Sequence, residues 1–111
     1  MTCYVDNMYL NPMGRFGRMK MSHLIANTEG ELHAMARQIG IARRWYQGDH
    51  YDISISKRQQ AILLGAVPVT MFELAGIRWC IKNRRNFNSP DHALLRMRRG
   101  FAEQAAKRGR G

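Results

Sequence analysis

Alternating apolar and polar positions mark the strands of this chain. From Tyr51 to Ile55, apolar residues alternate with Asp52 and Ser54, which is the period of a strand with one buried face. Three other β-prone or apolar runs also have the character of strands, and Pro68 restricts the last of them to a sheet edge or a strand start. The strands predicted in this way cover residues 2–5, 22–26, 51–55 and 67–69.

Helices are predicted where apolar residues recur every three or four positions behind a capping residue. Thr28, with Glu31 three residues later, has the sequence of a capping box, and Gly40 is the expected stop. Ser56 with Gln59 repeats this pattern at the end of the strand at 51–55. The predicted helices cover residues 28–39, 56–64 and 70–81, and a last one begins at Ser89-Pro90.

Strands and helices therefore alternate along most of the chain. This order predicts a small α/β domain in which a short, partly parallel sheet is flanked by helices. We expect the α/β core domain at residues 1–75 and a basic helical extension at residues 76–111.

Length and composition limit the class of protein. The chain has 111 residues, which is enough for one domain with a modest core. It contains no apolar run of the roughly 20 residues that a membrane span needs, and no secretory signal is visible at its start. Cys3 and Cys80 are too far apart to suggest a disulfide framework or a zinc site by themselves. We therefore expect a cytoplasmic protein with no membrane partner.

Positive charge is concentrated near the end of the chain. The formal net charge is +10, and residues 82–111 contribute nine Lys/Arg against Asp91 and Glu103, or 9 − 2 = +7. This asymmetry favours a nucleic acid or another polyanion as partner, although a basic, solvated end that only keeps the protein soluble has the same composition. The predicted nucleic-acid-binding residues are Arg84, Arg85, Arg96, Arg98, Arg99, Lys107 and Arg108.

The segment from His50 to Arg58 has the densest chemistry. If Ser56 is the N-cap of a helix, Lys57 and Arg58 lie in the first helical turn, where the helix dipole disfavours cations. Two cations at that position suggest an anion-binding site made by Ser56, Lys57, Arg58 and the free N–H groups of the helix.

A second candidate site combines carboxylates and imidazoles. Asp6 ends the first strand, His23 lies in the second, and His50 and Asp52 share one face of the third. If the strands are parallel neighbours, these four residues converge on one rim of the sheet. Such a group suits acid/base catalysis or a divalent metal ion, although no spacing matches a known metal signature. The alternative is that His50 and Asp52 only support the junction between strand and helix.

Several spaced motifs together resemble a known family. The chain is similar to a small domain-of-unknown-function family found in bacteria and very often in phage genomes. The motifs that carry the resemblance are Tyr4-Val5-Asp6-Asn7, Ser22-His23-Leu24, Glu31-Leu32-His33, Trp45, His50-Tyr51-Asp52 and Ser56-Lys57-Arg58.

The resemblance covers roughly residues 1–70, and the basic segment after about Gly76 lies outside it. Two positions depart from the family pattern: Met21 replaces a tryptophan, and Asn27 replaces an aspartate that a carboxylate-based mechanism could need. The resemblance implies a fold and a phage setting in a bacterial host, but no reaction.

Three functions remain open at this point. The leading prediction is a small phage-type accessory protein that binds a polyanion, most simply nucleic acid, through its basic C-terminal region. The first alternative is a metal-dependent phosphoester hydrolase or nuclease at Asp6, His23, His50 and Asp52, with help from Lys57 and Arg58. The second alternative is a phage effector that docks on a host protein. No established catalytic signature decides whether the protein is an enzyme.

Overall fold

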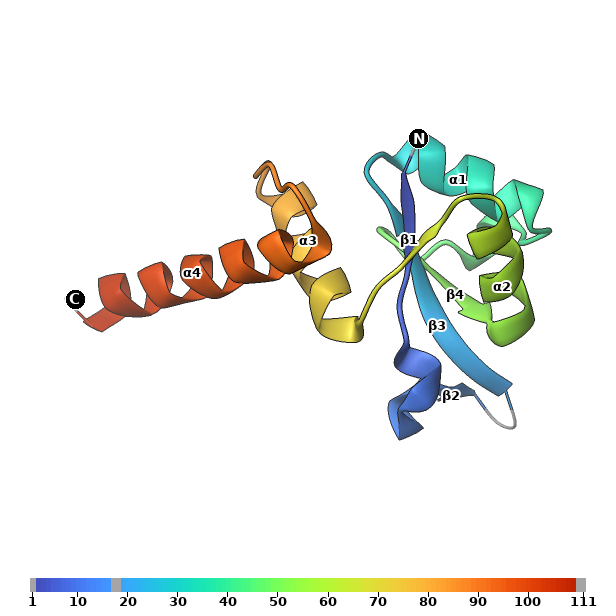
Figure 1. The fold of residues 1–111 in the computed structure, drawn as a ribbon, viewed down its shortest axis with the longest axis horizontal. Helices are drawn as coiled ribbons and strands as arrows, with labels where there is room; N and C mark the ends of the chain where they lie inside the picture. Colours follow the sequence, from blue (N-terminus) through green and yellow to red (C-terminus); the bar gives the residue numbers. More distant parts are fainter. Residues whose placement is uncertain (1, 17–18, 110–111) are drawn as a thin grey trace. The chain divides into compact units, whose positions relative to one another are not determined.

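The computed structural model describes residues 2–16 and 19–109. The chain forms two compact units, Met1–Met71 and Phe72–Gly111. The first unit holds the strands and two helices, and the second holds two helices (Figure 1). The boundary expected after residue 75 falls inside a helix that runs from Met71 to Lys82.

The first unit is built on a mixed sheet. Its strands are β1 (Cys3–Val5), β3 (Met19–Ala26), β4 (Tyr51–Ser54) and β5 (Val67–Pro68), and β2 (Arg15–Phe16) pairs with the first residues of β3. The order across the sheet is β4-β3-β1-β5. Only β1 and β5 run parallel among these pairs, while β3 is antiparallel to β1, β2 and β4. The predicted α/β class with a partly parallel sheet is confirmed, and Pro68 does lie in an edge strand.

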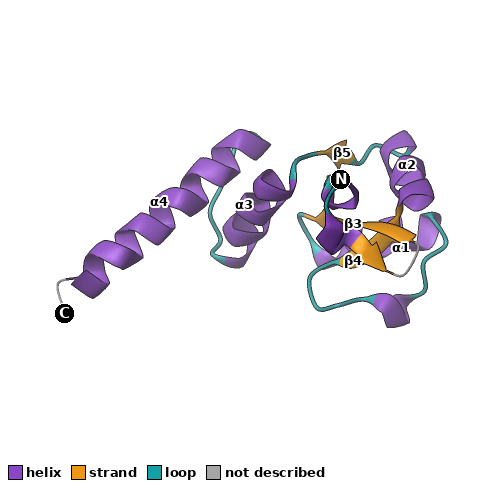
Figure 2. Cartoon of the chain, turned by 90° about the horizontal axis from the view of Figure 1, so that it is seen from below, coloured by secondary structure: helices purple, strands orange, loops and turns teal. Residues whose placement is uncertain are grey.

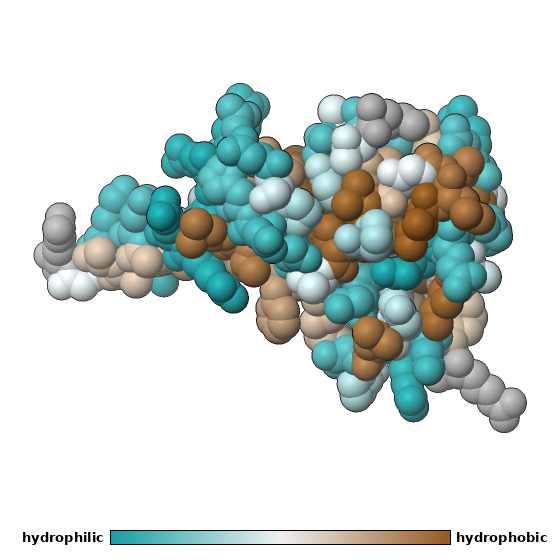
Figure 3. Space-filling view, viewed as in Figure 1, coloured by the Kyte–Doolittle hydropathy of each residue, from teal (hydrophilic) through white to brown (hydrophobic). Residues whose placement is uncertain are grey.

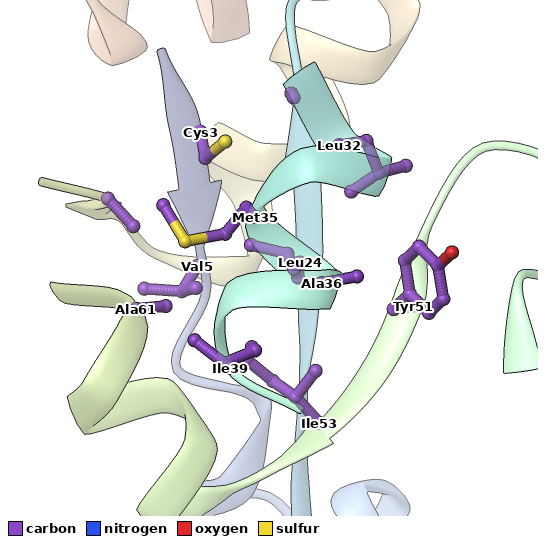
Figure 4. Packing of buried hydrophobic residues seen from close by; sticks show 12 residues of the cluster. Cys3, Val5, Leu24, Leu32, Met35, Ala36, Ile39, Tyr51, Ile53 and Ala61 are labelled. Atoms are coloured by element: carbon purple, nitrogen blue, oxygen red, sulfur yellow. The ribbon is translucent and has the colours of Figure 1, made fainter. Parts of the chain in front are cut away.

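Two helices pack against one face of this sheet. They are α1 (Glu29–Gln38) and α2 (Ile55–Leu63), and three short 3-10 turns cover Met8–Leu10, Pro12–Gly14 and Arg43–Trp45. Figure 4 shows the core between the strands and the helices. Its buried side chains include Cys3, Val5, Leu24, Tyr51 and Ile53 from the strands, and Leu32, Met35, Ala36, Ile39 and Ala61 from the helices. Alternate strand positions therefore point into this core, as the sequence period predicts.

The helix starts follow the sequence in one case and not in another. Thr28 caps α1, since its side chain accepts a hydrogen bond from the Glu31 N–H at 3.2 Å. The prediction of Ser56 as the second cap is wrong, because the chain turns into α2 two residues earlier. Ser54 has extended backbone angles (φ −70°, ψ 166°) and its side chain accepts from the Lys57 N–H at 3.4 Å. Ser56 is instead an exposed residue in the first turn of α2.

The second unit is a pair of helices, α3 (Met71–Lys82) and α4 (Pro90–Gly109), joined by a short loop (Figure 2). Ser89 caps α4, because the His92 N–H donates to its hydroxyl at 3.1 Å. The helices touch backbone to backbone at Gly76, where an added Cβ would lie 2.5 Å from the Leu94 backbone. Arg84, two residues after the end of α3, has a left-handed conformation (φ 54°).

Over residues 101–109 all side chains of α4 are exposed, and Figure 3 shows mostly hydrophilic surface on this unit. In the described part of the chain, no helix is both long and apolar enough to cross a membrane.

Candidate metal centre

A row of polar side chains crosses the face of the sheet opposite the core that α1 and α2 form. Val5 pairs with Leu24, so Asp6 follows β1 next to His23, and its N–H donates to the His23 carbonyl at 3.2 Å. On the other side of β3, His23 pairs directly with Asp52 of β4. Because residues paired across strands point to the same face, the three side chains come together.

The four residues predicted as a catalytic group therefore do lie together, but for a different reason than expected. The sequence argument assumed that their strands are parallel neighbours. Instead, β3 lies between β1 and β4 and is antiparallel to both. His23 is thus the central member of the group, and Asp6 and Asp52 contact it from opposite sides.

Asp6 is fully buried and its carboxylate is saturated with hydrogen bonds. Oδ1 accepts from the N–H groups of Met8 (3.2 Å) and His23 (2.9 Å). Oδ2 lies 2.7 Å from Nδ1 of the His23 ring. Since a carboxylate only accepts, Nδ1 carries the proton in this contact, and Nε2 faces Asp52 at 3.9 Å from Oδ1. Asp6 thereby fixes both the orientation and the tautomer of His23.

His50 is held in the same way as His23, with a carboxylate at Nδ1 and Nε2 facing Asp52. Its Nδ1 lies 2.6 Å from Oδ1 of Asp49, and its Nε2 lies 3.4 Å from Oδ1 of Asp52. The two imidazole rings meet edge to face with centroids 5.1 Å apart. The contact between His50 and Asp52 agrees with the prediction that strand alternation puts them on one face.

Both imidazole rings face the same oxygen of Asp52, Oδ1. Its other oxygen, Oδ2, accepts a hydrogen bond from Nε2 of Gln47 at 2.8 Å. The side chains of Asp52, His23 and His50 are 36%, 22% and 14% exposed. Hydrogen bonds with Asp6, Asp49 and Gln47 therefore orient the three side chains, which remain partly exposed to solvent.

Within residues 2–16 and 19–109, the group that could hold a metal ion is His23, His50 and Asp52. One ligand atom from each lies within 4.8 Å of the other two. Asp6 does not belong to this set, because its carboxylate is committed to His23 and to backbone amides. Sequence reasoning missed Gln47 and Asp49; the only available signal was their position in the polar turn directly before His50.

The predicted anion site is less open than expected. Arg58 donates from Nε to the Asp6 carbonyl at 2.8 Å, and its guanidinium lies 4.9 Å from the centre of the Tyr9 ring. The Lys57 ammonium lies beside the end of α1, 3.2 Å from where a Cβ on Gly40 would be. Arg58 is thus engaged by Asp6 and Tyr9, and Lys57 lies close to Gly40; an anion-binding role for Ser56, Lys57 and Arg58 remains a prediction.

The predicted nucleic-acid-binding residues all lie in the second unit. Arg84 and Arg85 follow α3, and the other five lie on α4. All except Arg96 are exposed.

The cysteines do not provide a nucleophile. Burial, with a smaller effect of Glu31, raises the pKa of the Cys3 thiol to about 11, and burial also raises the pKa of Cys80. Both thiols therefore stay protonated near neutral pH. Because the thiolate is the form that attacks or binds metal, neither cysteine is suited to those roles. Asn27, the departure from the family pattern, accepts a hydrogen bond from the Tyr4 hydroxyl at 3.1 Å and is not part of the metal-ligand group.

No curated protein and no solved structure matches the chain. One family model does, and its description reads "Protein of unknown function (DUF4031)". The match covers residues 3–79, so it extends beyond the limit near Gly76 that the sequence resemblance suggested and includes most of α3. The chain belongs to the DUF4031 family.

Proposed function

We propose that the first unit is a metal-dependent phosphoester hydrolase whose substrate is a nucleic acid. The observation that carries the proposal is the convergence of two imidazoles and one carboxylate, all partly exposed, on the sheet face opposite α1 and α2. A polar group of this kind, partly exposed and fixed by further side chains, is typical of a site for chemistry.

Each residue has a distinct task in this proposal. His23, His50 and Asp52 would hold a divalent ion, which would supply Lewis-acid chemistry for water activation and phosphoryl transfer. Asp6 keeps the proton of His23 on Nδ1, so that Nε2 offers its lone pair to the centre. Arg58 donates to the carbonyl of Asp6 and so braces the same strand end. The net charge of +10 attracts a polyanionic substrate over a long range.

A second candidate function rests on a separate observation. The basic residues of the second unit are mostly exposed, and α4 offers a fully exposed stretch at residues 101–109. This supports nucleic-acid binding through the C-terminal region, either as the only activity or as the means of substrate capture. The setting implied by the family resemblance is a phage protein in the cytoplasm of a bacterial host. Docking on a host protein stays a prediction that no feature of the described residues favours.

The hydrolase proposal is tested with metal-stripped protein. Single-stranded DNA, duplex DNA, RNA and bis(p-nitrophenyl) phosphate are incubated with added Zn²⁺, Mn²⁺ or Mg²⁺. We expect cleavage with metal, none with chelator, and a loss of at least 100-fold in His50→Ala. His92→Gln, a substitution on α4, is the matched control and should cleave like the wild type. Absence of turnover with every metal and substrate, in protein that remains folded, contradicts the proposal.

The binding candidate is tested by charge. Mobility shifts with chelator present are measured over a salt series for a variant with Gln at four basic positions of α4. The control carries four Gln at exposed basic positions of the first unit. The variant positions are Arg98, Arg99, Lys107 and Arg108, and the control positions are Arg15, Lys20, Arg37 and Arg44.

Each lost phosphate contact reduces the salt slope by about 0.9. The four substitutions of the α4 variant should therefore remove up to roughly 3.6 units of slope (4 × 0.9), while the control keeps the wild-type slope. Equal effects of the two variants contradict a specific role for α4.

A further inference from the structure

We infer that the segment Gln47–Asp52 is a metal-binding motif in which His50 and Asp52 ligate the ion while Gln47 and Asp49 position them, and that its ion is a transition metal of the zinc class rather than magnesium. His23 supplies the third ligand, and Asp6 positions it. The inference deepens the proposed function by naming the metal, but metal binding of this kind does not depend on the hydrolase reaction.

Each proposed ligand has one atom that faces the centre and one that faces away from it. The inward atoms are Nε2 of His23, Nε2 of His50 and Oδ1 of Asp52, and their contacts differ from those of the outward atoms. Every outward atom makes a short hydrogen bond: His23 Nδ1 at 2.7 Å, His50 Nδ1 at 2.6 Å and Asp52 Oδ2 at 2.8 Å. The inward atoms do not bond one another well, since the two Nε2 atoms lie 3.9 and 3.4 Å from Oδ1 of Asp52. These separations exceed the usual range for N–H···O bonds.

The inward separations fit a shared metal ion better than a hydrogen-bonded network. Zinc binds imidazole nitrogen and carboxylate oxygen at about 2.0–2.2 Å, so two ligands of a tetrahedral ion lie about 3.4 Å apart. The His50–Asp52 separation already has this value, the His23–Asp52 separation of 3.9 Å is somewhat longer, and all three ligand atoms lie within 4.8 Å of one another. An ordinary network of polar side chains instead turns its best donors and acceptors toward each other.

The supporting contacts match what metal ligands require. A ligating histidine usually donates its other N–H to a carboxylate or carbonyl, which fixes the tautomer and makes the ligating nitrogen more basic. Asp6 and Asp49 do this for His23 and His50, and Gln47 holds the second oxygen of Asp52. All three ligands are therefore positioned for monodentate binding.

The backbone explains how a short segment supplies both ligands and supports. Gly48 has a φ of +92°, and the N–H of Gln47 donates to the His50 carbonyl at 2.9 Å. The Tyr46 hydroxyl donates to the Gly48 carbonyl and ties the turn to the preceding residues. This tight turn places Gln47 and Asp49 beside the start of β4, where His50 and Asp52 already share a face.

The kinds of ligand atom indicate a transition metal rather than magnesium. Two imidazoles and one carboxylate suit zinc, iron, manganese or nickel, whereas magnesium prefers oxygen ligands and retains several waters. Three protein ligands on a partly exposed face also leave a position for water or substrate, as in catalytic rather than structural zinc sites.

The test uses the full chain after removal of metal, with each metal ion alone as the probe. Titration calorimetry with Zn²⁺ and Mg²⁺ should give one Zn²⁺ per chain, bound at least 100-fold more tightly than Mg²⁺. Co²⁺ should produce the visible absorption of a four- or five-coordinate site. Equal affinity for Mg²⁺ and Zn²⁺, or a six-coordinate cobalt spectrum with weak binding, overturns the assignment.

Variants distinguish positioning residues from parts of an ordinary turn. Asp49→Asn and Gln47→Ala should each weaken Zn²⁺ binding about 10- to 100-fold while the melting temperature of the metal-free protein stays near the wild-type value. Glu103→Gln, an exposed change on α4, is the control and should bind Zn²⁺ like the wild type. Unchanged affinity in both turn variants overturns the positioning roles.

The two proposals fail independently. Tight Zn²⁺ binding that depends on His23 and His50, without cleavage of any substrate, overturns the hydrolase and leaves the metal motif intact. Cleavage supported by Mg²⁺, without tight Zn²⁺ binding, overturns the motif and leaves the hydrolase intact.

Discussion

Replacing Asp6 with asparagine separates the support of the fold from the support of the metal centre. The asparagine carbonyl can still accept from the N–H groups of Met8 and His23, as Oδ1 of Asp6 does. Its amide nitrogen, however, then faces Nδ1 of His23 at the position of Oδ2, 2.7 Å away. Because an amide nitrogen only donates, Nδ1 must become an acceptor and the ring proton moves to Nε2. The lone pair that faces the centre is then lost.

The magnitudes follow from the number and kind of hydrogen bonds. Changing three charge-assisted bonds to neutral ones costs roughly 1 kcal/mol each, but removing a buried charge returns several kcal/mol of desolvation energy. We therefore expect Asp6→Asn to change the free energy of unfolding by no more than about 2 kcal/mol. Asp6→Ala leaves two backbone N–H groups without an acceptor and should cost about 2–6 kcal/mol. The wrong tautomer should weaken metal binding about 10- to 100-fold, or about 1.4–2.8 kcal/mol.

Three measurements check this reasoning. Urea unfolding gives the stability of both variants, zinc titration gives the affinity, and ¹⁵N NMR of the imidazole gives the tautomer of His23. We expect Asp6→Asn to stay folded with the proton on Nε2 and weak zinc binding. If Asp6→Asn keeps the proton on Nδ1 and binds zinc like the wild type, the assignment of Asp6 as a positioning residue is refuted.

Three further predictions concern the caps, a strained residue and a carboxyl pair. Ser54→Ala should lower the free energy of unfolding by about 1 kcal/mol in urea titrations, whereas Ser56→Ala should change it by a few tenths; the reverse order contradicts the cap at Ser54. Arg84→Gly should stabilise the second unit by about 1 kcal/mol, because glycine adopts a positive φ without steric cost, and an unchanged melting curve counts against this. The pKa of Asp91 is raised above its ordinary 3.8 by a hydrogen bond with Glu73 and by repulsion from its charge, so protonated Asp91 is favoured in the folded state. The stabilisation from protonated Asp91 is complete below the pKa of the unfolded chain and is lost as pH rises through the higher pKa of the folded protein. Asp91→Asn should therefore flatten the dependence of the free energy of unfolding on pH over that range, and parallel curves for the variant and the wild type contradict this prediction.

The sequence predicted the elements of the fold better than their connections. The period of apolar residues found β4 and the stripe of α1, because one-sided burial leaves a direct trace in the pattern. It did not give the antiparallel pairing of β3 with its neighbours, since pairing depends on contacts between distant segments. The helix start at Ile55 was missed by two residues because Ser54 and Ser56 are both good caps, and the local sequence does not distinguish them.

The residue types in the sequence identified the candidate site, but they did not show which residues are ligands and which support the ligands. Asp6, His23, His50 and Asp52 stood out as titratable residues at strand ends or on strand faces. That Asp6 supports His23 rather than joining the ligand group depends on its complete burial, which sequence alone does not show. Gln47 and Asp49 were overlooked for the opposite reason. Polar residues in a turn are common, and only the contacts with Asp52 and His50 distinguish these two.

The position of β4 in the sheet has a consequence for the dynamics of the centre. Among the described strands, β4 pairs only with β3, whereas β3, which holds His23, and β1, which Asp6 directly follows, have neighbours on both sides. Edge strands open locally at lower free energy than central ones. Opening of β4 would carry His50 and Asp52 away from His23 while the Asp6–His23 pair stays in place. Amide hydrogen exchange in residues 51–54 should therefore slow when the centre is loaded, whereas exchange at Val5 and Ile25, which lie in the pairing of β1 with β3, changes little.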